Sequence, residues 1–306
     1  MEPVFEKIVE DVFFGKSLFW DIFTQSLYFV DYVSRTINRY VPETQLHFRA
    51  TLETSSSFLI PVEDRGNKFV ISNRTQIAIV SWDGLKGTVD AISKIVDLDE
   101  LKNCNMLRTG KCDEWGRLWT GLLIMENYNP LRSIGRLYSY RVGTIKTYFD
   151  GEVVSGIAWN KSNSKMFYIN SSKKRVDAFD FDIINGDISN RQVLFTFENH
   201  QLDGMPYGMT SDEDDNLWIA IISASKVIKI STTKPETLLY TLNIPTEQPV
   251  SLAWGGENLD ELYISTSSFP NQSITMTRLL DGSLYRVTGL NTKGIPMHTF
   301  SLVCLP

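Results

Sequence analysis

Histidines, acidic residues and serines are the residues in this chain that could form a metal or catalytic site. Their spacing matches none of the usual motifs for such sites. The histidines His47, His200 and His298 lack the H-x-H or H-E-x-x-H spacing of a zinc site. The acidic run DEDDN at 212–216 lacks the glycine and the distal glutamate of an EF-hand loop, so we expect a solvated hairpin turn there. No G-x-S-x-G sequence indicates a serine nucleophile. These residues therefore predict no zinc site, no EF-hand loop and no Ser/His/Asp set.

Six short apolar segments recur along the chain and predict the elements that would position such a site. They are LYFV from Leu27, FVIS from Phe69, LWTG from Leu118, MFYI from Met166, LWIA from Leu217 and LYIS from Leu262. Their starts lie 42, 49, 48, 51 and 45 residues apart. Periods of this size are typical of β-propeller blades, whereas a β-sandwich would have shorter and less regular spacing.

A second β-rich run follows each segment across a turn, for example SWDG at 81–84 or KSNSK at 161–165. This pattern indicates hairpins of antiparallel strands, and a blade needs about four strands. We therefore predict an all-β, six-bladed β-propeller that forms a single domain over residues 1–306. The segment PVFEKIVE from Pro3 has no apolar core of its own, so we expect it to complete the last blade and close the ring.

The charge and the termini exclude several classes of partner. The formal net charge is −6 and no cluster of Lys or Arg is present, so nucleic acid and anionic membranes are poor partners. The N-terminal residues MEPVFEKIVED are acidic and contain no long apolar run, which argues against a signal peptide or a membrane span. We expect a monomer whose partner is a small molecule.

The cysteine content favours an intracellular protein. The chain has three cysteines, Cys104, Cys112 and Cys304. This odd, small number does not make a disulfide framework, so we expect reduced thiols and a cytoplasmic location. Four N-x-S/T sequences begin at Asn73, Asn160, Asn170 and Asn271, but they are weak indicators of secretion in a chain rich in Asn and Ser.

Specific sequence matches to a known family run from about Pro3 to about Pro296. They include TQSLYFVD, GRLWTG, KRVDAFDFDIINGDISNRQVLFTFE, DNLWIA, VIKIS, GGENLDELYIST and LYRVTGLNTKGI. These stretches resemble the family of regucalcin, the gluconolactonases and the luciferin-regenerating enzymes, with the insect luciferin-regenerating branch the most similar. The resemblance implies a six-bladed propeller with a ligand pocket at the mouth of its central channel.

The resemblance also implies where a metal ion would bind. In the family, one Glu, one Asn and one Asp from three blades hold a divalent cation, usually calcium, which polarises a lactone carbonyl. The family pattern G-E-x-P-x-W corresponds to GKSLFW, which puts Lys16 in the position of the Glu. VVSGIAW puts Ser155 in the position of the Asn, and MPYGMT puts Tyr207 in that of the Asp. We therefore expect no metal, no other cofactor and loss of the metal-dependent lactonase activity.

The wall of the family's substrate pocket differs here as well. The family pattern N-R-x-N-D-G-K corresponds to NMLRTGK, so Met106, Arg108 and Thr109 replace its Arg, Asn and Asp. The acidic position after the LWTG strand corresponds to Glu126 in LLIMENY. The implied ligand-binding residues are Lys16, Met106, Arg108, Thr109, Glu126, Ser155 and Tyr207.

Two of these residues have competing interpretations. Lys16 is either a solvated lysine at a strand start or an ammonium at the channel mouth, near the place of the lost ion and paired with Glu126. If it is buried and poorly paired, its pKa falls and it becomes a possible nucleophile or base. Tyr207 is either a packed aromatic that fills the place of the metal and its waters, or a catalytic phenol.

Three functions remain open from the sequence. The leading hypothesis is a small-molecule-binding protein or pseudoenzyme that keeps the pocket without the metal. The first alternative is a metal-independent hydrolase, lactonase-like or luciferin-regenerating-like, that uses Lys16, Tyr207 and Glu126. The second alternative is a protein-interaction scaffold that uses the loops at 99–110 and 266–280.

Overall fold

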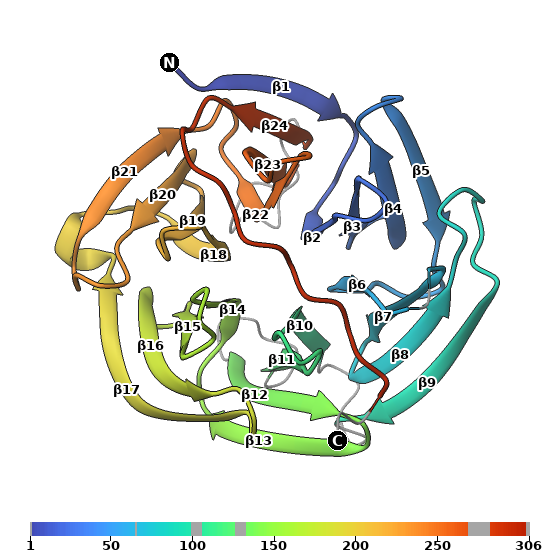
Figure 1. Ribbon diagram of the computed structural model, residues 1–306, viewed down its shortest axis with the longest axis horizontal. Coiled ribbons are helices and arrows are strands. Elements are labelled where there is room, and N and C mark those ends of the chain that lie inside the picture. The colour runs from blue at the N-terminus through green and yellow to red at the C-terminus, as the bar shows by residue number, and fades with distance from the viewer. Residues whose placement is uncertain (1, 65, 99–105, 126–132, 269–281, 304–306) are drawn as a thin grey trace.

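The chain folds into six antiparallel sheets arranged as a ring around a central axis (Figure 1). The computed structural model describes residues 2–64, 66–98, 106–125, 133–268 and 282–303. Each sheet has four strands, which confirms the predicted six-bladed β-propeller. No helix within these described ranges is long and apolar enough to cross a membrane.

In each blade the strands step outward from the axis, so the first of each set below is the inner strand (Figure 1). The first blade contains β2 (Gly15–Asp21), β3 (Ser26–Asp31), β4 (Thr36–Val41) and β5 (Leu46–Thr51). The second contains β6 (Leu59–Pro61), β7 (Lys68–Asn73), β8 (Gln76–Ser81) and β9 (Ala91–Asp97). The third contains β10 (Met106–Cys112), β11 (Leu118–Met125), β12 (Ser133–Arg141) and β13 (Thr144–Asp150). The fourth blade contains β14 (Val154–Trp159), β15 (Lys165–Asn170), β16 (Arg175–Asp182) and β17 (Asp187–Thr196). The fifth contains β18 (Met205–Ser211), β19 (Leu217–Ile222), β20 (Lys226–Ile230) and β21 (Leu238–Asn243). The sixth contains β22 (Pro249–Gly255), β23 (Glu261–Thr266), β24 (Leu284–Thr288) and β1 (Val4–Val9).

The six apolar segments of the sequence form the second strand of each blade. All residues of β3 and β19 are buried, because neighbouring blades cover both faces of these strands. A strand buried on both faces is a continuous apolar run, which is why these segments are the strongest signal in the sequence. The β-rich run after each segment forms the next strand outward, for example β4 after β3 and β20 after β19.

The first and the last strand of the chain meet in one sheet. β1 is the outer strand beside β24, with Val4 opposite Thr288 and Phe5 opposite Val287. Hydrogen bonds between the first and the last strand therefore hold the ring together, and no covalent link is needed at this point.

The segment after β24 crosses one face of the ring and closes one end of the central channel (Figure 1). Residues 289–303 form single bridges to three blades: Gly294 to Asp212, His298 to Cys112 and Phe300 to Val62. We call this stretch the crossing segment. Because it spans the axis, the channel opens toward the opposite mouth.

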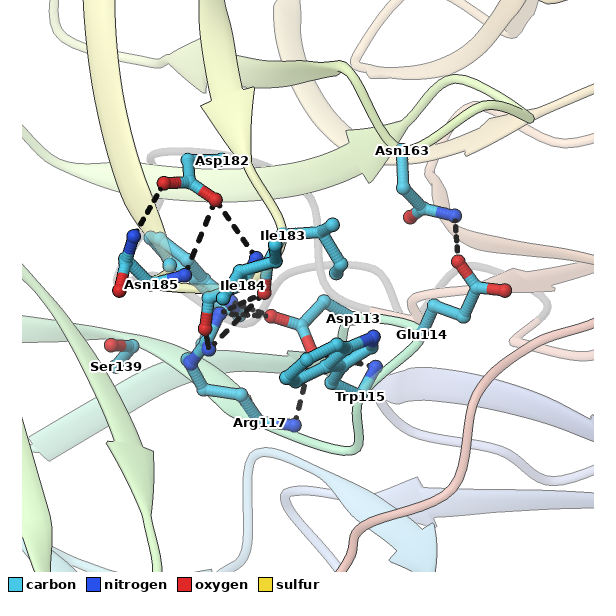
Figure 2. A network of polar contacts seen from close by, with 12 residues as sticks. Asp113, Glu114, Trp115, Arg117, Ser139, Asn163, Asp182, Ile183, Ile184 and Asn185 are labelled. Carbon is cyan, nitrogen blue, oxygen red and sulfur yellow. Dashed lines mark hydrogen bonds and ion pairs between the residues drawn. The ribbon is translucent and has the colours of Figure 1, made fainter. Parts of the chain in front are cut away.

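Two equivalent turns fix neighbouring strands through buried aspartates. In DEWGRLW at 113–119, Asp113 is buried and accepts hydrogen bonds from Trp119 Nε1 at 2.9 Å and Arg117 Nη1 at 2.9 Å. The Arg117 guanidinium also donates to the carbonyl oxygens of Ile183 and Ile184 in the next blade, as Figure 2 shows. This network ties the third blade to the fourth.

The second turn corrects one expectation from the sequence. Asp212, the first residue of the acidic run at 212–216, is buried and not solvated. Its carboxylate accepts from Trp218 Nε1 at 3.0 Å and pairs with Lys229 Nζ at 2.7 Å. Glu213 and Asp214 are exposed, so only that part of the run behaves as a solvated turn.

Candidate functional site

The central channel contains two cavities that share three polar residues. The mouth cavity has a volume of about 340 Å³ and lies at the open end; it is lined by Phe14, Lys16, Tyr32, Met106, Arg108, Leu123, Met205, Tyr207, Ile222, Gln248 and Ser267. The channel cavity, of about 60 Å³, reaches from there to Met297 and His298 of the crossing segment. Lys16, Arg108 and Tyr207 line both cavities and therefore form the layer between them.

Backbone irregularities aim side chains at this layer. Pairing to the second strand shifts register between Lys16 and Phe19 in β2, between Leu107 and Thr109 in β10, and between Pro206 and Met209 in β18. β14 and β22 carry similar shifts. A bulge interrupts the alternation of a strand and redirects a side chain, and bulges are frequent beside functional sites.

Lys16 points into the channel and is only 6% exposed. Its Nζ donates a hydrogen bond to the carbonyl oxygen of Arg108 at 2.8 Å. The same Nζ lies 5.2 Å from the ring centroid of Tyr32, 5.9 Å from that of Phe14 and 6.0 Å from that of Tyr207, which is within cation–π range. Burial lowers the pKa of Lys16, because the apolar surroundings disfavour the charged form. A solvated surface lysine does not describe this residue.

Tyr207 is buried against the same groups. Its ring makes an edge contact with Phe14, with 6.0 Å between centroids, and the Arg108 guanidinium carbon lies 5.1 Å from its centroid. Burial alone would raise the pKa of Tyr207, but the positive charges of Lys16 and Arg108 outweigh it, so the pKa is lowered. The phenol therefore occupies an electropositive site and fills space at the channel mouth.

Arg108 brings an unused hydrogen-bond donor to this layer. Its Nε is buried and has no hydrogen-bond partner among the described residues. A buried donor without a partner costs roughly 1–3 kcal/mol, so such a group in a cavity wall indicates a place for an acceptor.

The other predicted residues divide between the two cavities. Met106 lies in the mouth cavity, and its Sδ accepts a hydrogen bond from the Tyr32 hydroxyl at 3.2 Å. Thr109 and Ser155 line the channel cavity instead. The Thr109 carbonyl oxygen accepts from the Thr120 hydroxyl at 2.7 Å, and the Ser155 hydroxyl is 2.5 Å from that of Ser171.

Some predictions fall on residues that the structure does not describe. Glu126 lies outside the described residues, so its pairing with Lys16 stays a prediction. The same holds for most of the proposed scaffold loops, since 99–105 and 269–280 are not described.

Several residues of the site were missed by reasoning from the sequence. Phe14 and Tyr32 flank β2 and β3 and enclose the Lys16 ammonium, while Gln248 adds a polar group to the mouth cavity. Lys111 lines the channel cavity and follows Arg108 in the quoted motif NMLRTGK, but no role was predicted for it. The aromatic residues directly before β2 and directly after β3 were the available signal.

The residues present do not fit a divalent cation. The three positions that the resemblance assigns to metal ligands hold an ammonium, a hydroxyl and a phenol, and the ammonium is a positive charge. Within the described ranges, no group of three or more His, Cys, Asp or Glu could hold a metal ion. Calcium requires several converging anionic or carbonyl oxygens, and Lys16 would repel it.

Comparisons with known proteins agree with this fold. The family profile described as the SMP-30/Gluconolactonase/LRE-like region matches residues 14–268. Regucalcin from Homo sapiens is 27% identical over 292 residues, and that from Bos taurus is 28% identical over 294; each alignment covers 94% of both chains. A solved luciferin-regenerating enzyme superposes with a TM-score of 0.92 at 38% identity, covering 98% of this chain and all of the other. Regucalcin from Agrobacterium tumefaciens has a TM-score of 0.82 at 14% identity, with 96% of both chains covered, and shares the fold.

Proposed function

The chain belongs to the SMP-30/gluconolactonase/LRE-like family, and on that premise we propose that it binds a small organic anion at the mouth of its central channel without a metal ion. The ligand class is a carboxylate with a compact, flat apolar body. In this role the protein keeps the family's pocket and replaces its cation with the positive charge of its own side chains.

One observation carries this proposal: two cations and a tyrosine of lowered pKa form the floor of the mouth cavity, and none of its described lining residues is acidic. Lys16 and Arg108 present the positive charge, and the Arg108 Nε is available as a donor. Buried charges in proteins are normally paired, so this layer favours an anion supplied by a ligand.

The rest of the cavity suits an apolar body. Phe14, Tyr32, Leu123 and Ile222 surround the floor, and a volume of about 340 Å³ admits a small ring system. Ligand pockets are commonly apolar with a few placed polar groups, and this cavity lies at the lower end of their size range. Methionine side chains can adapt to the shape of such a ligand.

The test is a calorimetric titration with matched pairs of ligands, for example an aromatic carboxylate and its neutral amide. The carboxylate should bind, the amide should bind at least about tenfold more weakly, and Lys16→Met should remove most of the difference. Lys146→Met changes a partly exposed lysine of β13 that lines neither cavity and serves as the matched control. Equal affinity for the acid and the amide in the wild-type protein would contradict the proposal.

A second candidate function is a metal-independent hydrolase. It is favoured by the lowered pKa values of both Lys16 and Tyr207, which bring a neutral amine and a phenolate closer to neutral pH. The luciferin-regenerating enzyme with which the chain shares 38% identity makes a related reaction worth testing. Turnover of lactones or aryl esters in the presence of a chelator, lost in both Lys16→Met and Tyr207→Phe, would support this candidate. Absence of any turnover would leave binding as the function.

A further inference from the structure

Below the mouth, the wall of the channel cavity contains a lysine, Lys111 of β10, that the mouth cavity does not share. The other five inner strands each contribute an apolar residue to the same wall: Leu18, Ile60, Ile157, Met209 and Leu252. These five residues are buried, each at most 5% exposed. Lys111 is therefore a cation in a cavity wall to which every other inner strand adds an apolar side chain.

Lys111 has little to compensate its charge. Its Nζ lies 3.5 Å from the carbonyl oxygen of Met209, which is long for a hydrogen bond. No carboxylate among the described residues forms an ion pair with it, and none of the residues that line the channel cavity is acidic. Burial lowers the pKa of Lys111 to about 8, so it still carries a proton at neutral pH.

The other charged side chains in the wall have the same sign as Lys111. Lys16 and Arg108 close the top of the channel cavity, and His298 of the crossing segment closes the bottom. Burial lowers the pKa of His298, and the positive charge of Lys111 lowers it further, while Glu114 acts in the opposite direction, so the imidazole is neutral at neutral pH. The positive charge of the cavity therefore comes from Lys16, Arg108 and Lys111.

Size decides which anion the channel cavity can hold. A volume of about 60 Å³ accommodates a few water molecules or one small ion, since a single water needs roughly 10–15 Å³ by this measure. It does not accommodate the organic body proposed for the mouth cavity. Waters alone would leave the clustered positive charges without a counter-ion in surroundings of low dielectric constant.

We propose that a small inorganic anion of halide size binds in the channel cavity beside Lys111, between the layer of Lys16 and Arg108 and the crossing segment. This site lies below the mouth cavity, with which it shares the layer of Lys16, Arg108 and Tyr207, and is centred on Lys111, which lines the channel cavity and not the mouth cavity. The bound anion compensates the Lys111 ammonium and lies where all six inner strands meet, so it stabilises the folded ring.

The experiment uses chloride as the probe and measures thermal unfolding at constant ionic strength, with methanesulfonate, which is bulkier, as the replacing anion. The melting temperature of the wild-type protein should rise by roughly 2–4 °C or more as chloride replaces methanesulfonate. Lys111→Met, which replaces the cation by an apolar side chain, should fold and lose this response. Lys146→Met changes a lysine of β13 that lines neither cavity, so it is the matched control and should retain the full response.

A second measurement keeps the proposal testable if a variant fails to fold. Crystals of the wild-type protein grown in bromide should show an anomalous peak beside Lys111 Nζ. No peak there, a melting temperature independent of chloride, or a chloride response unchanged in Lys111→Met would overturn the proposal. Binding of the organic carboxylate at the mouth is measured separately in Lys111→Met, so failure of one site is distinguishable from failure of the other.

Discussion

Cations in the blades and cations in the channel have different partners. In the blades, Lys229 pairs with the buried Asp212 at 2.7 Å, and Arg117 pairs with the buried Asp113 at 2.9 Å. In the channel, Lys16 contacts the Arg108 carbonyl oxygen and the side chains of Tyr32 and Tyr207, and Lys111 lies near the Met209 carbonyl oxygen. The fold itself supplies a carboxylate to each blade cation, whereas the channel cations have no acidic partner among the described residues.

This difference separates structural charges from charges that can serve a ligand. A buried cation without an anion destabilises the protein, and a fold gains stability when a ligand supplies that anion. The blade pairs also bind Trp119 and Trp218 through the same carboxylates, so they hold neighbouring strands together. In the channel, Lys16 of β2 donates a hydrogen bond to the Arg108 carbonyl oxygen of β10, but no carboxylate among the described residues pairs with its charge, so that charge is available to a bound anion.

The largest change in the free energy of unfolding is expected from breaking an ion pair within a blade. Asp212→Asn leaves the Lys229 ammonium without its anion, so we expect a loss of about 3–5 kcal/mol in the free energy of unfolding. Denaturant midpoints measure this loss, and Asp214→Asn, an exposed change in the same turn, should stay within about 0.5 kcal/mol of the wild type. Equal, small effects in both variants would show that the Asp212 pair is not structural.

Replacing Lys111 should change the free energy of unfolding in the opposite direction and stabilise the protein. Its pKa in the folded protein, about 8, is below its ordinary value of 10.5, so the unfolded chain binds more protons between these two pH values. Stability should therefore rise with pH across this window, and below pH 8 the full cost of about 3 kcal/mol is present. In buffer without small anions, Lys111→Met should be more stable than the wild type at pH 7 and should lack this rise. A destabilised but folded Lys111→Met in that buffer would contradict the comparison.

A smaller effect is expected at Lys16. In the absence of ligand, Lys16→Met removes a charge with no acidic partner among the described residues, so the free energy of unfolding should be unchanged or slightly higher. Chemical denaturation in buffer without carboxylates tests this. A loss of about 3–5 kcal/mol would instead reveal an acidic partner outside the described ranges, for which Glu126 is the candidate, and would place Lys16 with the blade cations.

The smallest effect is expected from restoring the family's ligands. The triple change Lys16→Glu, Ser155→Asn and Tyr207→Asp puts a glutamate, an asparagine and an aspartate in the wall of the channel cavity, so the folded variant should gain measurable calcium affinity. Calorimetry would detect it, and lactone turnover should remain absent because Met106 and Arg108 still alter the pocket wall. A folded variant without calcium affinity would mean that at least one of the three positions is wrongly aligned.

The sequence predicted the ring well because its signal is local and repeated. Each apolar segment is buried on both faces, so six similar runs at similar spacing reveal six blades. It also identified Lys16, Arg108 and Tyr207, which do line one layer of the channel, through short motifs that resemble those of a family.

Features that depend on neighbouring strands could not be predicted in this way. The register shifts in β2, β10 and β18 decide which side chains face the channel, and a single strand does not reveal them. For this reason Lys111 received no role. Asp212 looked solvated because its partners, Trp218 and Lys229, come from the next two strands.

The central claim is that the channel has an anion site in place of a metal site. The most direct test compares how much a cation and an anion each raise the melting temperature of the wild-type protein. Melting temperatures are recorded at constant chloride and ionic strength, with millimolar calcium in one series and an aromatic carboxylate in the other. We predict that the carboxylate raises the melting temperature in a saturable manner and that calcium leaves it unchanged. A saturable rise with calcium and none with the carboxylate would contradict the account.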